Sequence, residues 1–183
     1  MVFRILLSFL IVFSAGAAEV AGVKIPDEDQ KLLLNGAGLR KRAFFQVYVI
    51  GLYLPEKKTI ATEAVGATGP KRILIHMLRD VDADQFSGAL TDGIRDNVSE
   101  AEMKALEPRV KQLVAIMGEM KEAKTGMRIA LDWTPAGTQL SVNGKASGSA
   151  IPGEDFYRAL LKIWLGENPV QADLKKALLG EKQ

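Results

Sequence analysis

The spacing of apolar residues changes period twice along this chain of 183 residues, and no other feature constrains the fold as much. Residues 23–54 are typical of strands, because their second part is rich in the aromatic and β-branched side chains that suit a pleated sheet. Residues 71–78 are apolar almost throughout and predict another strand. Residues 56–70, rich in threonine, alanine and glycine, could hold a short helix but are interpreted as a connection.

Helical spacing begins after residue 80. Asp82 or Asp84 can cap a helix whose apolar residues lie three and four positions apart as far as Ile94. Ser99 followed by Glu102 has the signature of a capping box and predicts the start of a second helix. The apolar stripe of this second helix is typical of a surface that faces the core.

Strand spacing returns at residues 127–133, and the pair Asn143 and Gly144 predicts a two-residue hairpin turn. Two further helices are expected at residues 156–164 and 173–179. The order of strands, helices, hairpin and helices predicts one α+β domain. In such a domain an antiparallel sheet is covered on one face by a layer of helices.

Charged residues are interleaved along the chain, and their sum is nearly neutral. The formal net charge is +2 at pH 7, although 25% of the residues are charged. Nucleic acid is not expected as a partner, because phosphate backbones require a concentrated basic surface. The chain contains no cysteine, which excludes thiol catalysis and cysteine-based metal sites.

The first 18 residues have the three-part pattern of a secretory signal peptide. Arg4 supplies a positive charge, residues 5–13 are almost entirely apolar, and small residues follow as far as Ala18. The apolar run is too short to span a bilayer comfortably, which favours cleavage over an uncleaved anchor. We therefore predict a signal peptide over residues 1–18 and an exported domain over residues 19–183 that is not stably inserted in the membrane.

Residues that could carry catalysis or bind a metal are sparse. The single histidine, His76, lies in an apolar run, and the chain has neither a G-x-S-x-G motif nor a recognisable spacing of metal ligands. A partly buried strand histidine is the preferred interpretation. The glycine pattern that begins at Gly36 lacks the third glycine of a dinucleotide site, because Lys41 stands there. No metal and no cofactor are expected.

Residues 35–53 contain the most suggestive combination of side chains. Arg40 and Tyr48 would share one side of an unbroken strand, and a hairpin could also bring them together. The guanidinium offers two parallel donors to a carboxylate and the phenol adds one more, beside apolar Ile50 and Leu52. This suits a ligand with an acidic head and an apolar body. Spacing alone, however, favours a structural role in which Arg40 pairs with a surface acid.

The same stretch resembles the chalcone-isomerase fold family. Residues 36–40 resemble its glycine-rich strand that bears an arginine, and residues 47–53 resemble the strand that follows. The resemblance resumes at residues 86–93 and 156–179. It is strongest to exported bacterial members, which implies a periplasmic location. It also implies a curved antiparallel sheet, a helix layer and a ligand cleft between them.

The resemblance argues against the reaction of the plant enzymes, which close a chalcone to a flavanone. Those enzymes use an arginine, a threonine, a tyrosine and an asparagine. Of these positions, Arg40 alone keeps the family residue. The other three are occupied by Tyr48, Phe86 and Gly93. Because loss of one donor aimed at developing charge lowers the rate by about 10²–10³-fold, the resemblance implies little flavonoid cyclisation.

Arg40 and Tyr48 instead match the pair that holds the carboxylate in the fatty-acid-binding branch of the family. The resemblance therefore implies an exported protein that binds a fatty acid or a similar small acidic apolar ligand, without isomerase catalysis. The residues expected to bind this ligand are Arg40, Tyr48, Ile50, Leu52, Phe86, Leu90 and Thr91.

Two alternatives remain open. The first is an isomerase or lyase acting on an enone or phenolic substrate, with Arg40 stabilising an oxyanion and Tyr48 acting as donor or acid. Phe86 and Gly93 argue against it, because neither supplies a polar group. The second is a partner-binding scaffold in which side chains fill the cleft.

Overall fold

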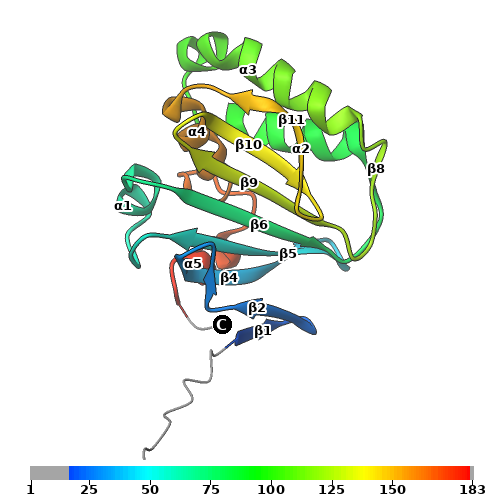
Figure 1. Ribbon diagram of the computed structural model, residues 1–183, viewed down its shortest axis with the longest axis vertical. Coiled ribbons are helices and arrows are strands. Elements are labelled where there is room, and N and C mark those ends of the chain that lie inside the picture. The colour runs from blue at the N-terminus through cyan, green and yellow to red at the C-terminus, as the bar shows by residue number, and fades with distance from the viewer. Residues whose placement is uncertain (1–16, 182–183) are drawn as a thin grey trace, which may run out of the picture.

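The computed structural model describes residues 17–181. A curled antiparallel sheet has helices packed against one face (Figure 1), which confirms the predicted α+β architecture. Most of the predicted signal peptide, residues 1–16, lies outside the described residues, whereas Ala17 and Ala18 belong to the first strand. Within residues 17–181 no helix is both long and apolar enough to cross a membrane.

The main sheet has seven strands, and every neighbouring pair is antiparallel. From one edge to the other they are β11 (Lys145–Ile151), β10 (Gly137–Val142), β9 (Arg128–Thr134), β6 (Lys71–Met77), β5 (Phe45–Leu54), β4 (Leu32–Arg42) and β3 (Glu28–Asp29). Two small antiparallel pairs complete the strands: β1 (Ala17–Val20) with β2 (Val23–Pro26), and β7 (Val81–Asp82) with β8 (Glu122–Ala123).

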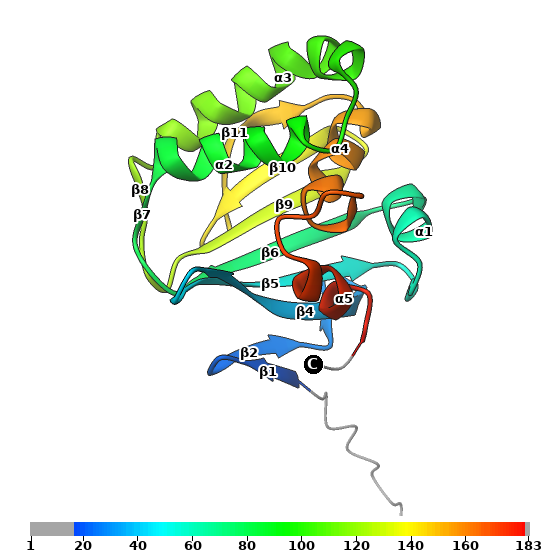
Figure 2. The ribbon, with the colours of Figure 1, turned by 180° about the vertical axis from the view of Figure 1, so that it is seen from behind.

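Five helices are present in the described part of the chain. They are α1 (Ala61–Gly66), α2 (Ala83–Arg95), α3 (Glu100–Gly118), α4 (Glu154–Leu165) and α5 (Ala172–Leu178). Figure 2 shows α2, α3 and α4 over the same face of the sheet, with α5 beside β4. The short α1 lies in the segment interpreted as a connection, so the alternative of a short helix there is the one that the structure shows.

Side-chain caps fix where the two central helices begin. Of the two candidates for the α2 cap, the structure uses Asp82, whose carboxylate accepts hydrogen bonds from the backbone nitrogens of Asp84 and Gln85. The predicted capping box of α3 is also present, because Ser99 and Glu102 each accept from the other's backbone nitrogen. These caps set the position of α2, which forms one wall of the cleft described below.

Both faces of β5 are buried, and they contribute to two different cores. Ile50 and Leu52 face the helix layer and are fully buried there. Val49 and Tyr53 face the opposite side, where the β1–β2 hairpin contributes Ile25. Burial of each large aliphatic side chain contributes about 1.5–3 kcal/mol. The β5 strand is therefore a rigid element on which to build a site.

Gly36 allows α5 to lie directly on β4. A Cβ atom at this position would lie 2.1 Å from the carbonyl oxygen of Ala177 in α5, which is far inside van der Waals contact. Next to it, Asn35 donates from its side-chain nitrogen to the carbonyl oxygens of Leu178 and Lys58. The glycine and the buried amide together hold α5 against the strand that carries Arg40.

Candidate functional site

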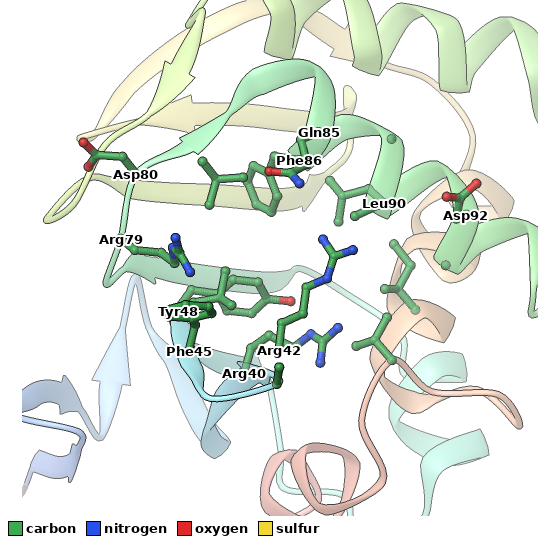
Figure 3. Close-up of a pocket in the computed structure, with 18 of the residues that line it drawn as sticks. Arg40, Arg42, Phe45, Tyr48, Arg79, Asp80, Gln85, Phe86, Leu90 and Asp92 are labelled. Atoms are coloured by element: carbon green, nitrogen blue, oxygen red, sulfur yellow. The ribbon is translucent and has the colours of Figure 1, made fainter.

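A cleft of about 730 Å³ lies between the β4–β5 hairpin and α2 (Figure 3). The hairpin forms one wall, and α2 forms the other with Phe86 and Leu90. The segment after β6 lines one end, and Ile163 and Val170 close the side toward α4. The predicted cleft between sheet and helices is therefore present.

Arg40 and Tyr48 meet across the hairpin and not along one strand. They are direct partners in the β4–β5 register, and a register irregularity follows between Arg40 and Lys41. Both residues line the cleft. The second of the two geometries considered from the sequence is thus the one that the fold uses.

The Tyr48 phenol is buried; its oxygen accepts a hydrogen bond, and its hydrogen is donated to no acceptor within residues 17–181. The side chain is 5% exposed, and its hydroxyl oxygen accepts a hydrogen bond from Nε1 of Trp164 at 3.0 Å. Burial raises the pKa of Tyr48, although the Trp164 hydrogen bond and the Arg40 guanidinium act in the opposite direction. The phenol therefore stays neutral and keeps a proton that it can donate to a group in the cleft.

Arg40 is half-buried and has no carboxylate partner within residues 17–181. Its Nη1 donates to the carbonyl oxygen of Lys41 and to Oε1 of Gln171, the latter at 3.3 Å. This arrangement contradicts the structural role in which Arg40 pairs with a surface acid. The guanidinium instead lines the cleft, where a carboxylate could pair with it.

Gln171 positions Arg40, and sequence reasoning missed it. Its amide oxygen accepts from the backbone nitrogen of Lys41 at 2.8 Å, and its amide nitrogen donates to the carbonyl oxygen of Leu39 at 3.0 Å. The side chain therefore holds the backbone on both sides of Arg40 while it also accepts from the guanidinium. Because Gln171 is 131 residues from Arg40 along the chain, no local pattern could have indicated it.

The α2 wall is apolar where the plant enzymes have polar groups. The Phe86 ring centroid lies 6.2 Å from that of Tyr48, and the phenyl ring carries no donor. At Gly93, which also lines the cleft, a Cβ atom would lie 2.8 Å from a side-chain carbon of Ile163. A side chain at this position would push against α4. The fold thus leaves no room for an asparagine here.

Three of the predicted ligand-binding residues do not line the cleft, which corrects their placement. Ile50 and Leu52 face the predicted side of β5 but lie deeper along the strand, where they are fully buried in the core. Thr91 follows Leu90 on α2, and one helical step turns it away from the cleft. It lines a groove between α2 and α3, and its hydroxyl donates to the carbonyl oxygen of Ser87.

Two further arginines, Arg42 and Arg79, line the cleft and were not predicted. The Arg79 guanidinium lies 4.4 Å from the centre of the Phe45 ring, which is a cation–π contact. Asp80 also lies here, but its carboxylate accepts two hydrogen bonds from Thr125, which lower its pKa. Basic groups therefore border the cleft on the hairpin side.

His76 lies on β6 and does not line the cleft. It is partly buried, as expected from the sequence. Its Nε2 atom has no hydrogen-bond partner among the described residues. Burial lowers the pKa of His76, with the charge of Arg128 adding to the effect, so the imidazole stays neutral.

Comparison with known proteins places this architecture in a family. Residues 17–180 match the model of the chalcone isomerase-like family. A search of curated proteins found no match. Among solved structures, a fatty-acid binding protein of Arabidopsis thaliana has a TM-score of 0.69 at 14% sequence identity, over 86% of this chain and 92% of that chain. The TM-score shows a shared fold, and the family model matches nearly the whole described chain, so the protein belongs to the chalcone isomerase-like family.

Proposed function

We propose that the protein binds a fatty acid or a similar small acidic apolar ligand in the cleft, without isomerase catalysis. One observation carries the proposal: Arg40, which forms no ion pair with a carboxylate among residues 17–181, lies opposite a neutral Tyr48 phenol with a proton to donate. Together they provide charged and neutral donors for a carboxylate. The structural similarity to a fatty-acid binding protein supports this choice of ligand class.

The remainder of the cleft suits an apolar chain. Its volume of about 730 Å³ lies in the usual range for small-molecule sites. Val47, Phe86, Leu90, Ile163 and Val170 provide apolar surface around the polar end. A ligand that placed its carboxylate at Arg40 would bury its chain against these side chains.

The same geometry supports binding better than turnover. An isomerase or lyase needs polar groups that move protons or stabilise developing charge. Phe86 supplies none, and Gly93 has no room for one. Tyr48 can donate a hydrogen bond, but its raised pKa keeps the phenol protonated and therefore unavailable as a base. Arg40 and Tyr48 would be the catalytic residues if turnover occurred.

Export belongs to the proposal as well. The family match begins at residue 17, close to the predicted end of the signal peptide. The first described strand begins at Ala17, within the small residues of the export pattern. We propose cleavage after Ala17 or Ala18 and a periplasmic location. The mass of the mature protein isolated from the periplasmic fraction tests both.

The ligand is tested by native purification of the mature protein, organic extraction and mass spectrometry. A stoichiometric fatty acid is expected with the wild-type protein and is expected to be absent from Arg40→Ala. Arg158→Ala is the matched control, because Arg158 is an exposed arginine of α4 that pairs with Glu154. Wild-type protein that is empty and fails to bind added fatty acids would refute the proposal. Steady turnover of a chalcone, lost in Arg40→Ala, would establish the enzyme instead.

A further inference from the structure

The tip of the β4–β5 hairpin exposes two adjacent phenylalanines. Phe44 is 100% exposed and Phe45 is 57% exposed, the two largest values for large apolar side chains within the described residues. Scattered single apolar residues are normal on protein surfaces. Two adjacent aromatic side chains at a turn are a different feature, because Phe44 protrudes fully into solvent and Phe45 beside it is more than half exposed.

Positive charges surround these phenylalanines. Lys41 and Arg42 precede them on the hairpin, and Arg79 stacks on the Phe45 ring from the segment after β6. None of the three cations forms an ion pair with a residue in the range 17–181. The neighbouring acid, Asp80, points its carboxylate at Thr125. The hairpin tip, which we define as residues 41–45 with Arg79, is therefore both aromatic and basic.

The hairpin tip is continuous with the cleft. Arg42, Ala43 and Phe45 all line it, whereas Phe44 at the end of the turn does not. Ala43 has a φ of 52°, in the left-handed region, so the chain reverses sharply just before Phe44. In Figure 3, Phe45 and Arg79 lie at one end of the space between the hairpin and α2, and the Arg42 side chain extends from the hairpin toward α2. A surface that contacted Phe44 would thus lie beside the cleft.

We propose that the hairpin tip docks the protein reversibly on an anionic lipid bilayer. Aromatic side chains favour the boundary between headgroups and acyl chains, and Lys or Arg side chains beside them are attracted to anionic lipids. The tip presents both kinds of group on one turn. Docking in this way would bring the cleft next to the membrane surface. This inference does not depend on which ligand the cleft holds.

The test is co-sedimentation of the mature protein with vesicles of phosphatidylcholine that contain about one third phosphatidylglycerol. Wild-type protein is expected to bind these vesicles, and to bind pure phosphatidylcholine more weakly. Phe44→Ala is expected to lower the partition coefficient about tenfold, because an aromatic side chain no longer enters the interface. Lys41→Gln is expected to lower it about fivefold, and high salt should reduce binding further.

Matched controls lie at the other end of the sheet. Ile60 is 54% exposed and precedes α1, so Ile60→Ala removes an exposed apolar side chain far from the tip. Lys57→Gln removes an exposed cation at that same end. Both are expected to bind vesicles like the wild type. Phe44→Ala should also keep the wild-type affinity for a fatty acid in vesicle-free solution, because Phe44 does not line the cleft.

Three outcomes would overturn the inference. The first is wild-type protein that does not bind the anionic vesicles. The second is equal vesicle binding by Phe44→Ala and Ile60→Ala. The third is a protein that self-associates through the tip, with dimers lost in Phe44→Ala and no binding to vesicles. The cleft proposal survives all three, because fatty-acid binding is measured without vesicles.

Discussion

At the scale of single residues, Arg40 differs from the other arginines that are substantially covered by protein. Arg72 forms two hydrogen bonds with the carboxylate of Asp132, and Arg109 does the same with Asp155. Among residues 17–181, the Arg40 guanidinium donates hydrogen bonds to a carbonyl oxygen and an amide oxygen and forms no ion pair. An arginine held by neutral acceptors keeps its charge available for a carboxylate that arrives from outside.

Two substitutions of Arg40 should distinguish the contribution of its positive charge to fatty-acid affinity from that of its planar pair of donors. Arg40→Ala is expected to weaken the binding of a long-chain fatty acid by at least about a hundredfold, because the charged hydrogen bonds are lost. Arg40→Lys is expected to weaken it about tenfold, since a lysine keeps the charge but not the planar pair of donors. Isothermal titration calorimetry measures both affinities. Equal affinity for the two variants and the wild type would remove Arg40 from the site.

Tyr48→Phe should affect binding and stability together. Affinity for the fatty acid is expected to fall about tenfold, because a neutral donor to the carboxylate is lost. The buried Nε1 of Trp164 also loses its acceptor, so the free energy of unfolding should fall by about 1–3 kcal/mol. Titration calorimetry and urea unfolding give the two values. A stable variant with unchanged affinity would show that the phenol is not a ligand donor.

At the scale of elements, sequence patterns predicted where the central helices begin but not which connections carry structure. The Asp82 and Ser99 caps are local, because both partners lie within three residues. The tight turn at Asn143 and Gly144 is local as well, and both residues adopt positive φ there. The α1 helix is not local: it has no side-chain cap, and Ala64 is fully buried in the core. Tertiary packing stabilises this helix, so its own sequence gave little sign of it.

The candidate site was predictable from the sequence where neighbouring residues determine it, and not where distant elements supply its side chains. Alternation in β5 placed Tyr48, Ile50 and Leu52 on one face, which the core confirms. Alternation cannot say how deep along the strand a cleft reaches, and the cleft ends before Ile50. Arg79 and Gln171 enter the site from other elements, so only the sheet order and the docking of α5 bring them there.

The contact between α5 and β4 makes a stability prediction. Gly36→Ala is expected to lower the free energy of unfolding by about 2–4 kcal/mol, because the new methyl group would overlap the α5 backbone. Gly118→Ala is the control, since no atom lies within 4 Å of its Cβ position at the end of α3. That control should change stability by less than about 1 kcal/mol. Similar urea midpoints for the two variants would contradict the close packing.

At the scale of the whole molecule, ion pairs connect the layers. Lys71 of β6 is fully buried, and its Nζ lies 2.9 Å from Oε1 of Glu154 in the first turn of α4. On the same helix, Asp155 pairs with Arg109 of α3 at 2.6 Å. The carboxylate of Glu154 thus connects α4 to the sheet, and the carboxylate of Asp155 connects α4 to α3. The long-range order of strands and helices sets these pairs, so no local sequence pattern indicated them.

These pairs predict how stability depends on pH. The hydrogen bond from Lys71 lowers the pKa of Glu154, and that from Arg109 lowers the pKa of Asp155. A carboxylate whose pKa is lower in the folded state stabilises the fold above its unfolded pKa, and this contribution is lost as the pH falls through the folded value. The free energy of unfolding should therefore decrease below about pH 5.

Glu154→Gln tests the Lys71 pair directly. At pH 7 this variant is expected to be less stable by about 1–2 kcal/mol, less than for a fully buried pair because Glu154 is one third exposed. As the pH falls through the lowered pKa of folded Glu154, the difference from the wild type should shrink, since the wild-type carboxylate is then protonated too. Lys71→Met removes the buried charge itself and should be as stable as the wild type at pH 7. Urea unfolding across this pH range gives the curves, and a constant gap between Glu154→Gln and the wild type would show that ionisation of Glu154 does not connect β6 to α4.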